Sequence, residues 1–222
     1  DLAKTPLEFS PGEAWNYSVS TDVIGYLIGQ ISGMPFEQFL KQRIFNPLGM
    51  NDTDFFVPAD KAHRFAACYS ADPKGGMTFH ATERKGNLTL QDDPTTSSFL
   101  TPPSFISGGG GLCSTAADYL TFCRTLINGG EFDGVRLLGP KTLKLMTSNH
   151  LPGGVDLPTL SRSLFSEASY NGIGFGLGFS VTMDPAKTLI LGSPGEYAWG
   201  GAATTSFWID PAEELIAIFM TQ

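Results

Sequence analysis

The chain has 222 residues, a formal net charge of −8 and a pI near 4.8, with 41% hydrophobic and 16% charged residues. This apolar content is enough for a packed core in one large domain or two small ones. The acidic balance, with no run of lysine or arginine, argues against nucleic acid or an anionic membrane surface as a partner. No apolar run approaches the roughly 18 to 20 residues that a membrane-spanning helix needs.

The cysteine and histidine residues form no pattern typical of a metal site. Cys68, Cys113 and Cys123 are an odd number without metal-ligand spacing, and we expect free thiols in or near the core. The three histidines are scattered, with no His-Glu-x-x-His pattern. The four glycines at 108–111 are not followed by the Lys-Ser or Lys-Thr of a phosphate loop. The sequence therefore predicts neither a metal nor a cofactor.

Amphipathic patterns predict four helices in the first 150 residues. They run from Ser20 to Gly33, from Pro35 to Asn46, from Ser114 or Thr115 to about 128, and from Pro140 to about 148. Ser20 is expected to be the N-cap of the first helix, and Gly33 is expected to end it.

The stretch from 51 to 111 has little periodicity. It holds Asp-Pro-Lys-Gly-Gly at 72–76 and short strand-like pieces at 65–70, 77–81 and 87–90. A segment this long without regular structure usually lines or covers a site.

Strand patterns fill the last part of the chain. Apolar residues alternate with glycine or small polar residues over 172–183, which predicts a strand with one nearly bare face on which another element packs closely. Runs at 187–192, 198–209 and 214–221 then predict an antiparallel meander. The expected fold class is α+β, with a mainly helical and loop region at 1–169 and an antiparallel sheet portion at 170–222.

A glycine pair interrupts the third of these strand patterns, in Trp199-Gly200-Gly201. Glycine inside a strand marks a bend, or a place where a ligand or another backbone approaches closely. Tyr17 precedes the first helix and, taken alone, is equally typical of a half-buried structural tyrosine.

Four segments in order resemble the serine β-lactamase-like superfamily, and most closely its class C branch with the related family VIII carboxylesterases. They are Phe9-Ser10-Pro11-Gly12, Tyr17-Ser18, the glycine-rich Ser107 to Thr115, and Trp199-Gly200-Gly201. The resemblance covers nearly the whole chain and implies a β-lactamase/transpeptidase-like fold, with the antiparallel sheet flanked by helices.

The superfamily brings together a Ser-x-x-Lys helix, a Tyr-x-Asn-like triplet and a Lys-Thr-Gly-like strand. Tyr17-Ser18-Val19 resembles the second element and Trp199-Gly200-Gly201 the third, but no serine here has a lysine three places on. Thr82-Glu83-Arg84-Lys85 has the spacing with the wrong nucleophile. The resemblance thus implies an incomplete domain, a fragment that lacks the N-terminal part. It leaves a signal peptide open, and the bacterial cytoplasm and periplasm as alternatives.

The resemblance also implies roles for the matching residues. Tyr17 would be the base that takes the nucleophile's proton, or the relay to the leaving group. The backbone N–H of Ala202 would be one oxyanion donor, and Gly200 and Gly201 would leave room for an acyl group. Val19 and Trp199 stand where lactamases carry Asn and Lys or His, which favours uncharged, apolar substrates.

These residues imply a serine hydrolase with an acyl-enzyme, expected to be a carboxylesterase acting on small apolar esters. A β-lactamase or D-alanyl peptide hydrolase is the alternative enzyme, with amide or lactam substrates. Because the nucleophile motif is absent, a non-catalytic fragment or binding module is the alternative from another class. An incomplete sheet would leave apolar edges exposed, so we also expect self-association.

Overall fold

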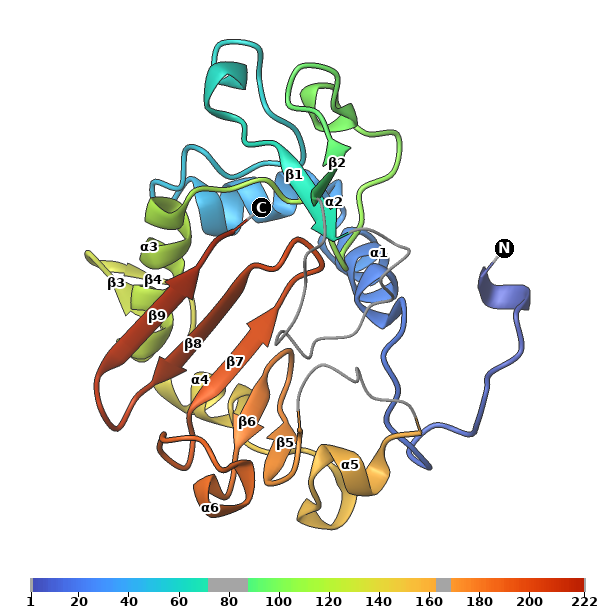
Figure 1. The fold of residues 1–222 in the computed structure, drawn as a ribbon, viewed down its shortest axis with the longest axis vertical. Helices are drawn as coiled ribbons and strands as arrows, with labels where there is room; N and C mark the ends of the chain where they lie inside the picture. Colours follow the sequence, from blue (N-terminus) through green and yellow to red (C-terminus); the bar gives the residue numbers. More distant parts are fainter. Residues whose placement is uncertain (1, 72–87, 163–168, 222) are drawn as a thin grey trace.

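The computed structural model describes residues 2–71, 88–162 and 169–221, so the strand piece expected at 77–81 lies outside it. A five-stranded antiparallel sheet with the order β5-β6-β7-β8-β9 lies at its centre (Figure 1). The strands are β5 (Ile173–Phe175), β6 (Ser180–Thr182), β7 (Tyr197–Gly200), β8 (Ser206–Asp210) and β9 (Leu215–Phe219). Helices flank this sheet, which confirms the expected α+β class.

Two helices, α3 (Ala116–Ile127) and α4 (Pro140–Met146), cover one face of the sheet and lie behind it in Figure 1. Thr115 caps α3 by accepting a hydrogen bond from the Asp118 N–H at 3.2 Å, as one of the two expected caps. The core joins the two helices to the sheet through Cys123, Leu126, Leu143, Val181, Tyr197, Phe207 and Ile209. The opposite face leaves Trp208, Leu215 and Phe219 exposed.

The helical region begins with α1 (Ser20–Ser32) and α2 (Phe36–Leu40), which continues into a π-helical turn at Lys41–Phe45. Gly33 ends α1 in the left-handed conformation, as expected. The prediction that Ser20 is the N-cap is wrong, because the helix already includes Ser20. Ser18 organises the entry instead, since its Oγ accepts a hydrogen bond from the Ser20 N–H at 3.2 Å.

The remaining elements are short. They are two hairpins, β1 (Cys68–Ala71) with β2 (Leu88–Asp92) and β3 (Glu131–Phe132) with β4 (Val135–Arg136), the helices α5 (Leu157–Leu160) and α6 (Pro185–Thr188), and 3-10 turns at Leu2–Lys4, Ala62–Arg64, Ser98–Leu100 and Pro152–Gly154. None of the helices in the described ranges is long and apolar enough to cross a membrane.

Three strand predictions need correction. The run 198–209 is two antiparallel strands, β7 and β8, joined by a turn. The stretch 172–183 is a hairpin of β5 and β6 and not one strand, and Gly178 has the positive φ of 107° that its turn requires. The run 187–192 is not a strand, because Asp184 caps α6 there by accepting a hydrogen bond from the Ala186 N–H at 3.1 Å. The nearly bare face is confirmed: a Cβ on Gly174 would overlap the Asn149 side chain.

Candidate active site

The ring of Tyr17 is stacked on the ring of Trp199. Their centroids are 6.4 Å apart with an interplanar angle of 12°. Tyr17 lies just before α1 and is 53% exposed, whereas Trp199 lies on β7 with its ring partly buried against the core. The structure therefore brings together the two motifs that the sequence places near opposite ends of the chain.

Two further aromatic rings extend this contact into a continuous wall. Phe175 on β5 meets Trp199 edge-on at 5.4 Å, and Trp15 meets Phe175 at 5.2 Å. The wall of Trp15, Phe175, Trp199 and Tyr17, called here the aromatic wall, offers a large apolar surface beside the phenol of Tyr17. Sequence reasoning missed Trp15 and Phe175. The available signal was the position of Trp15 two residues before Tyr17, since residues two apart lie on the same side of an extended segment.

The segment that carries Trp15 and Tyr17 is held by the end of α5. The Trp15 N–H donates to the carbonyl of Leu160 at 3.1 Å, and the Arg162 N–H donates to the carbonyl of Trp15 at 3.4 Å. The Arg162 guanidinium also lies 4.9 Å from the centroid of the Phe9 ring, a cation–π distance. These contacts fix the backbone as it approaches α1, where Val19 lies half-exposed.

The glycine pair serves the turn between β7 and β8. Gly200 ends β7 opposite Ser206, and the Gly201 N–H donates to the Thr205 carbonyl at 2.8 Å. The next residue, Ala202, is exposed, and its N–H makes no hydrogen bond within the described ranges. The bend that the sequence predicts is confirmed, and a Cβ on Gly201 would overlap the Thr205 hydroxyl. The close approach of a ligand to this backbone stays a prediction.

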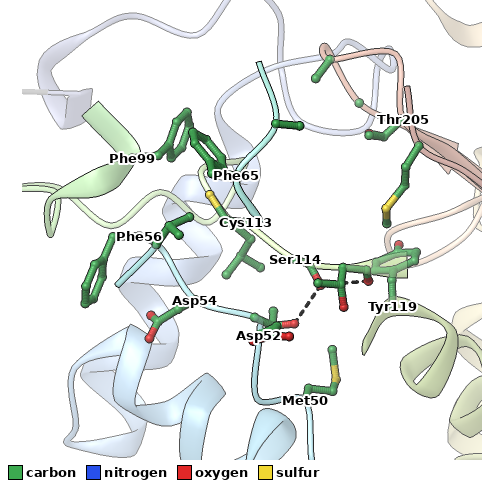
Figure 2. Close-up of a pocket in the computed structure, with 18 of the residues that line it drawn as sticks. Met50, Asp52, Asp54, Phe56, Phe65, Phe99, Cys113, Ser114, Tyr119 and Thr205 are labelled. Atoms are coloured by element: carbon green, nitrogen blue, oxygen red, sulfur yellow. Dashed lines mark hydrogen bonds between the residues drawn. The ribbon is translucent and has the colours of Figure 1, made fainter. Parts of the chain in front are cut away.

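A cleft of about 1010 Å³ opens beside this turn. Figure 2 shows Thr205 facing it from the β7–β8 side, with Phe65 and Phe99 on the segments next to β1 and β2. Asp54, in the segment that follows the π-helical turn, also lines it. As expected, residues from the irregular stretch 51–111 form much of its wall. Trp199, Gly200, Gly201 and Ala202 all line the cleft, whereas Tyr17 and Val19 do not.

Charged groups at the base of the cleft neutralise one another. Asp52 accepts two hydrogen bonds from the Arg64 guanidinium at 2.7 and 2.9 Å and lies 2.7 Å from the Lys61 ammonium. These partners hold the pKa of Asp52 well below its usual range, first through the Arg64 hydrogen bonds. The Asp118 carboxylate accepts from the Asp52 N–H at 2.7 Å and from the Thr53 hydroxyl at 2.9 Å. The network fixes the wall of the cleft.

The thiol of Cys113 also lines the cleft. Burial, with a smaller contribution from the charges of Asp92 and Asp54, raises its pKa to about 11. It therefore remains a neutral thiol at physiological pH and is a poor nucleophile. Across the described part of the chain, no group of three or more His, Cys, Asp or Glu side chains could hold a metal ion.

Comparison with protein families matches residues 1–222 to the family described as Beta-lactamase. The chain belongs to the β-lactamase family. It is 37% identical, over all of its length and 52% of the relative's, to "Protein Rv1367c" of Mycobacterium tuberculosis H37Rv. It is 25% identical, over 99% of its length and 48% of the relative's, to a protein of Escherichia coli K12 named "Putative D-alanyl-D-alanine carboxypeptidase".

The β-lactamase fold is confirmed by a solved structure described as "EstCE1, a hydrolase with promiscuous acyltransferase activity". The TM-score is 0.71 at 26% identity, and the match covers 98% of this chain and 53% of EstCE1. The chain thus spans about half the length of the relatives that it matches.

Proposed function

We propose that this chain supplies the tyrosine and the glycine-strand wall of a serine hydrolase that acts through an acyl-enzyme on small apolar esters. The observation that carries the proposal is the stacking of Tyr17 on Trp199, 6.4 Å between ring centroids. It joins the two sequence segments that resemble catalytic motifs of a hydrolase family to which the chain belongs.

The chemistry assigns one role to each part of the site. A serine hydroxyl attacks a carbonyl only when a base removes its proton. The ionised form of Tyr17, a tyrosinate, would be that base. A phenol with a reference pKa of about 10 needs a nearby ammonium group to ionise near neutral pH. The Ala202 N–H, which has no acceptor within the described residues, would stabilise the developing oxyanion.

The surroundings of Tyr17 favour an uncharged substrate. The aromatic wall offers four rings in sequence, and Val19 adds an exposed aliphatic side chain where a lactamase-like site has an amide. An apolar acyl or alcohol group would bury against these rings, whereas a carboxylate placed against Trp199 would lose its hydration at the position where a lactamase-like site has Lys or His. The description of EstCE1 as a hydrolase with acyltransferase activity supports a reaction that passes through an acyl-enzyme.

The serine and its lysine are proposed to come from outside these residues, because no serine in the 222-residue sequence has a lysine three places on. The test therefore uses the complete reading frame that encodes this chain. An organophosphonate should label one serine of a Ser-x-x-Lys segment, and p-nitrophenyl butyrate should be hydrolysed. Tyr17→Phe should lower kcat by about 100-fold or more. Tyr26→Phe, on an exposed tyrosine of α1, should leave kcat unchanged.

Failure to hydrolyse any short-chain p-nitrophenyl ester or any cephalosporin would overturn the enzyme proposal. A β-lactamase or D-alanyl peptide hydrolase is the second candidate, favoured by the name of the Escherichia coli relative. Rapid acylation by a fluorescent penicillin, with slow ester turnover, would favour this second candidate over the esterase.

The absence of Ser-x-x-Lys also supports a candidate of another class, a non-catalytic binding module. The esterase proposal expects that the 222-residue chain alone has no turnover above background. It further expects a Ser-x-x-Lys segment in the upstream reading frame. A reading frame without that segment would favour the binding module.

A further inference from the structure

A carboxylate in the first turn of α1 is bound by a loop distant in the sequence. The Ser107 hydroxyl donates to Asp22 Oδ1 at 2.5 Å, and the Gly109 N–H lies 3.4 Å from the same oxygen. The Gly109 N–H also donates to Ser107 Oγ at 3.1 Å. Asp22 and Ser107 are both partly buried, so this contact, called here the Asp22–Ser107 clamp, is shielded from bulk water on one side.

The backbones on the two sides of the clamp are in close contact. A Cβ on Gly108 would overlap the carbonyl oxygen of Thr21 and would lie 3.3 Å from the Cα of Gly25. Gly25 in turn has no free space, because a Cβ there would lie 3.1 Å from the Phe36 ring. Glycine at both positions lets the loop sit directly on the first turns of α1, so the clamp joins surfaces that already fit.

The clamp lies where it can set the position of Tyr17. The helix begins at Ser20, and Val19 before it provides no side-chain cap. The Tyr17 ring is half-exposed and reaches the sheet through its stacking on Trp199. The backbone hydrogen bonds of Trp15 hold one side of Tyr17, and the first turn of α1 holds the other. The position of the Tyr17 ring therefore depends in part on how this first turn is held.

We infer that Asp22 and Ser107 are positioning residues for Tyr17, a role that rests on the proposed function. Losing either group lets the first turn of α1 and the Tyr17 ring shift relative to the Trp199–Gly201 strand. A shift of about 1 Å in a reacting group can lower a rate by about 100-fold. The loss falls on kcat with little change in KM, because the other three rings of the aromatic wall, those of Trp15, Phe175 and Trp199, are left in place.

A simpler role for Asp22 gives a different pattern. A carboxylate in the first turn stabilises any helix through the helix dipole, by about 0.3 to 1 kcal/mol. In that case Asp22→Ala would lower the melting temperature and Ser107→Ala would change little. Activity would then follow the folded fraction.

The experiment compares Asp22→Ala, Ser107→Ala and the double variant in the complete reading frame, with p-nitrophenyl butyrate as substrate. We expect each single variant to lower kcat by about 10- to 100-fold at unchanged KM, and the double variant to be no worse than the poorer single one. Asp22→Asn keeps an oxygen acceptor for the Ser107 hydroxyl and should recover most of the loss.

Asp93 and Thr95 provide the matched control, because the Asp93 carboxylate accepts from the Thr95 hydroxyl at 2.6 Å and from its N–H at 2.8 Å. Asp93→Ala should leave kcat and KM unchanged. Additive losses, a rise in KM alone, or activity that follows the melting temperature would overturn the positioning role.

A readout independent of activity separates the clamp from the proposed function. Amide hydrogen exchange of the complete protein should rise at residues 18–23 and 107–111 in both Asp22→Ala and Ser107→Ala. Unchanged exchange there would overturn the clamp even in an active enzyme. Local loosening in a protein that hydrolyses no ester would support the clamp as a structural contact. It would overturn the hydrolase proposal, and with it the positioning role that rests on that proposal.

Discussion

Tyr17 and Trp199 lie with their rings nearly parallel, 6.4 Å between centroids, although one precedes the first long helix and the other stands on the third strand of the sheet. Phe175 fixes the Trp199 ring from the side by an edge contact at 5.4 Å. The indole of Trp199 therefore contacts the Tyr17 phenol by stacking and the Phe175 ring by an edge contact. Its replacement should affect substrate binding before it affects the fold.

We predict that Trp199→His raises the KM for p-nitrophenyl butyrate by about tenfold in the complete protein, because an aromatic pair contributes about 0.5 to 1.5 kcal/mol beyond its buried area. Trp199→Phe keeps a ring in the stack and should raise KM less. The matched control is Trp208→His, since Trp208 stands on the neighbouring strand with its ring exposed on the opposite face. Equal effects of the two histidine variants would contradict a role for Trp199 in binding.

Local signals in the sequence were sufficient for the four predicted helices, but not for the N-cap of α1 or for the short helices α5 and α6. Gly33 ends α1 because its backbone adopts the left-handed conformation, and Thr115 begins α3 because its side chain caps the helix. Neither helix end needs a distant contact to be predicted. The stretch 172–183 was mispredicted because apolar and small residues alternate with period two across both strands of a hairpin and its tight turn. The turn that divides it depends on the positive φ of Gly178, which the hydrophobic pattern does not reveal.

The candidate site was only partly predictable for the same reason. Tyr17 and Trp199 were found through motifs, but Phe175 joins them through the sheet pairing of β5, β6 and β7. The link between Asp22 and Ser107 is likewise a tertiary contact. No local pattern in the sequence encodes which loop will meet which helix. Both contacts are therefore visible only in the folded structure.

Asn149 and Gly174 give a stability prediction. The Asn149 Oδ1 accepts from the N–H groups of Leu151 and Phe175 at 3.1 Å each, and a Cβ on Gly174 would overlap this side chain. Gly174→Ala should therefore lower the free energy of unfolding by about 1 to 3 kcal/mol, as overpacking of a tight core does. Urea unfolding would measure the change.

Gly110 is the matched control for that measurement, because a Cβ there would meet no atom within 4 Å and its φ is not positive. Gly110→Ala should leave stability unchanged or raise it by about 0.4 to 1 kcal/mol. An equal loss in both variants would show that the loss does not come from the contact with Asn149.

Tyr197 gives a prediction of the opposite sign. Its ring is buried in the core, and its hydroxyl has no hydrogen-bond partner in the described part of the structure. A buried, unsatisfied polar group lowers stability by about 1 to 3 kcal/mol, so Tyr197→Phe should be neutral or stabilising. Tyr197→Leu also removes the ring contact with Phe179 at 5.2 Å and should destabilise. A clear loss of stability in Tyr197→Phe would indicate a partner for the hydroxyl.

The buried thiol of Cys123 and the partly buried thiol of Cys113 predict how stability depends on pH. Burial raises the pKa of Cys123 to about 12, and burial with nearby carboxylates raises that of Cys113 to about 11, from 9.0. Above pH 9 the thiols ionise in the unfolded chain but stay neutral in the folded one. Their contribution is therefore fully present below pH 9 and is lost as the pH rises through 11 to 12.

Urea unfolding between pH 7 and 11 checks the sign, since the wild type should lose stability more steeply above pH 9 than Cys113→Ala does. At pH 8, a rise of two pKa units lowers the thiolate fraction by about 100-fold. Iodoacetamide should accordingly modify Cys113 far more slowly than free cysteine. Rapid labelling of Cys113 in the folded protein would contradict the raised pKa.

The uncovered face of the sheet predicts self-association of the 222-residue chain. Leu215 and Phe219 on β9 are exposed on the same face as Trp208, and β9 is the last strand in the order of the described sheet. Apolar side chains beside a free strand edge favour pairing with another copy. Light scattering at high concentration should give a mass above the 23.8 kDa of one chain.

The double variant Leu215→Lys, Phe219→Lys should shift the mass toward the monomer, because lysine on an edge strand opposes pairing. Leu189 and Leu191 allow a matched control, since both are exposed but lie in the loop after α6, away from the sheet edge. Lysine at these two positions should leave the association unchanged, because it adds the same charge without touching β9. A mass of 23.8 kDa for the wild type at all concentrations would contradict the prediction. Equal dissociation by both double variants would assign the effect to net charge instead of the sheet edge.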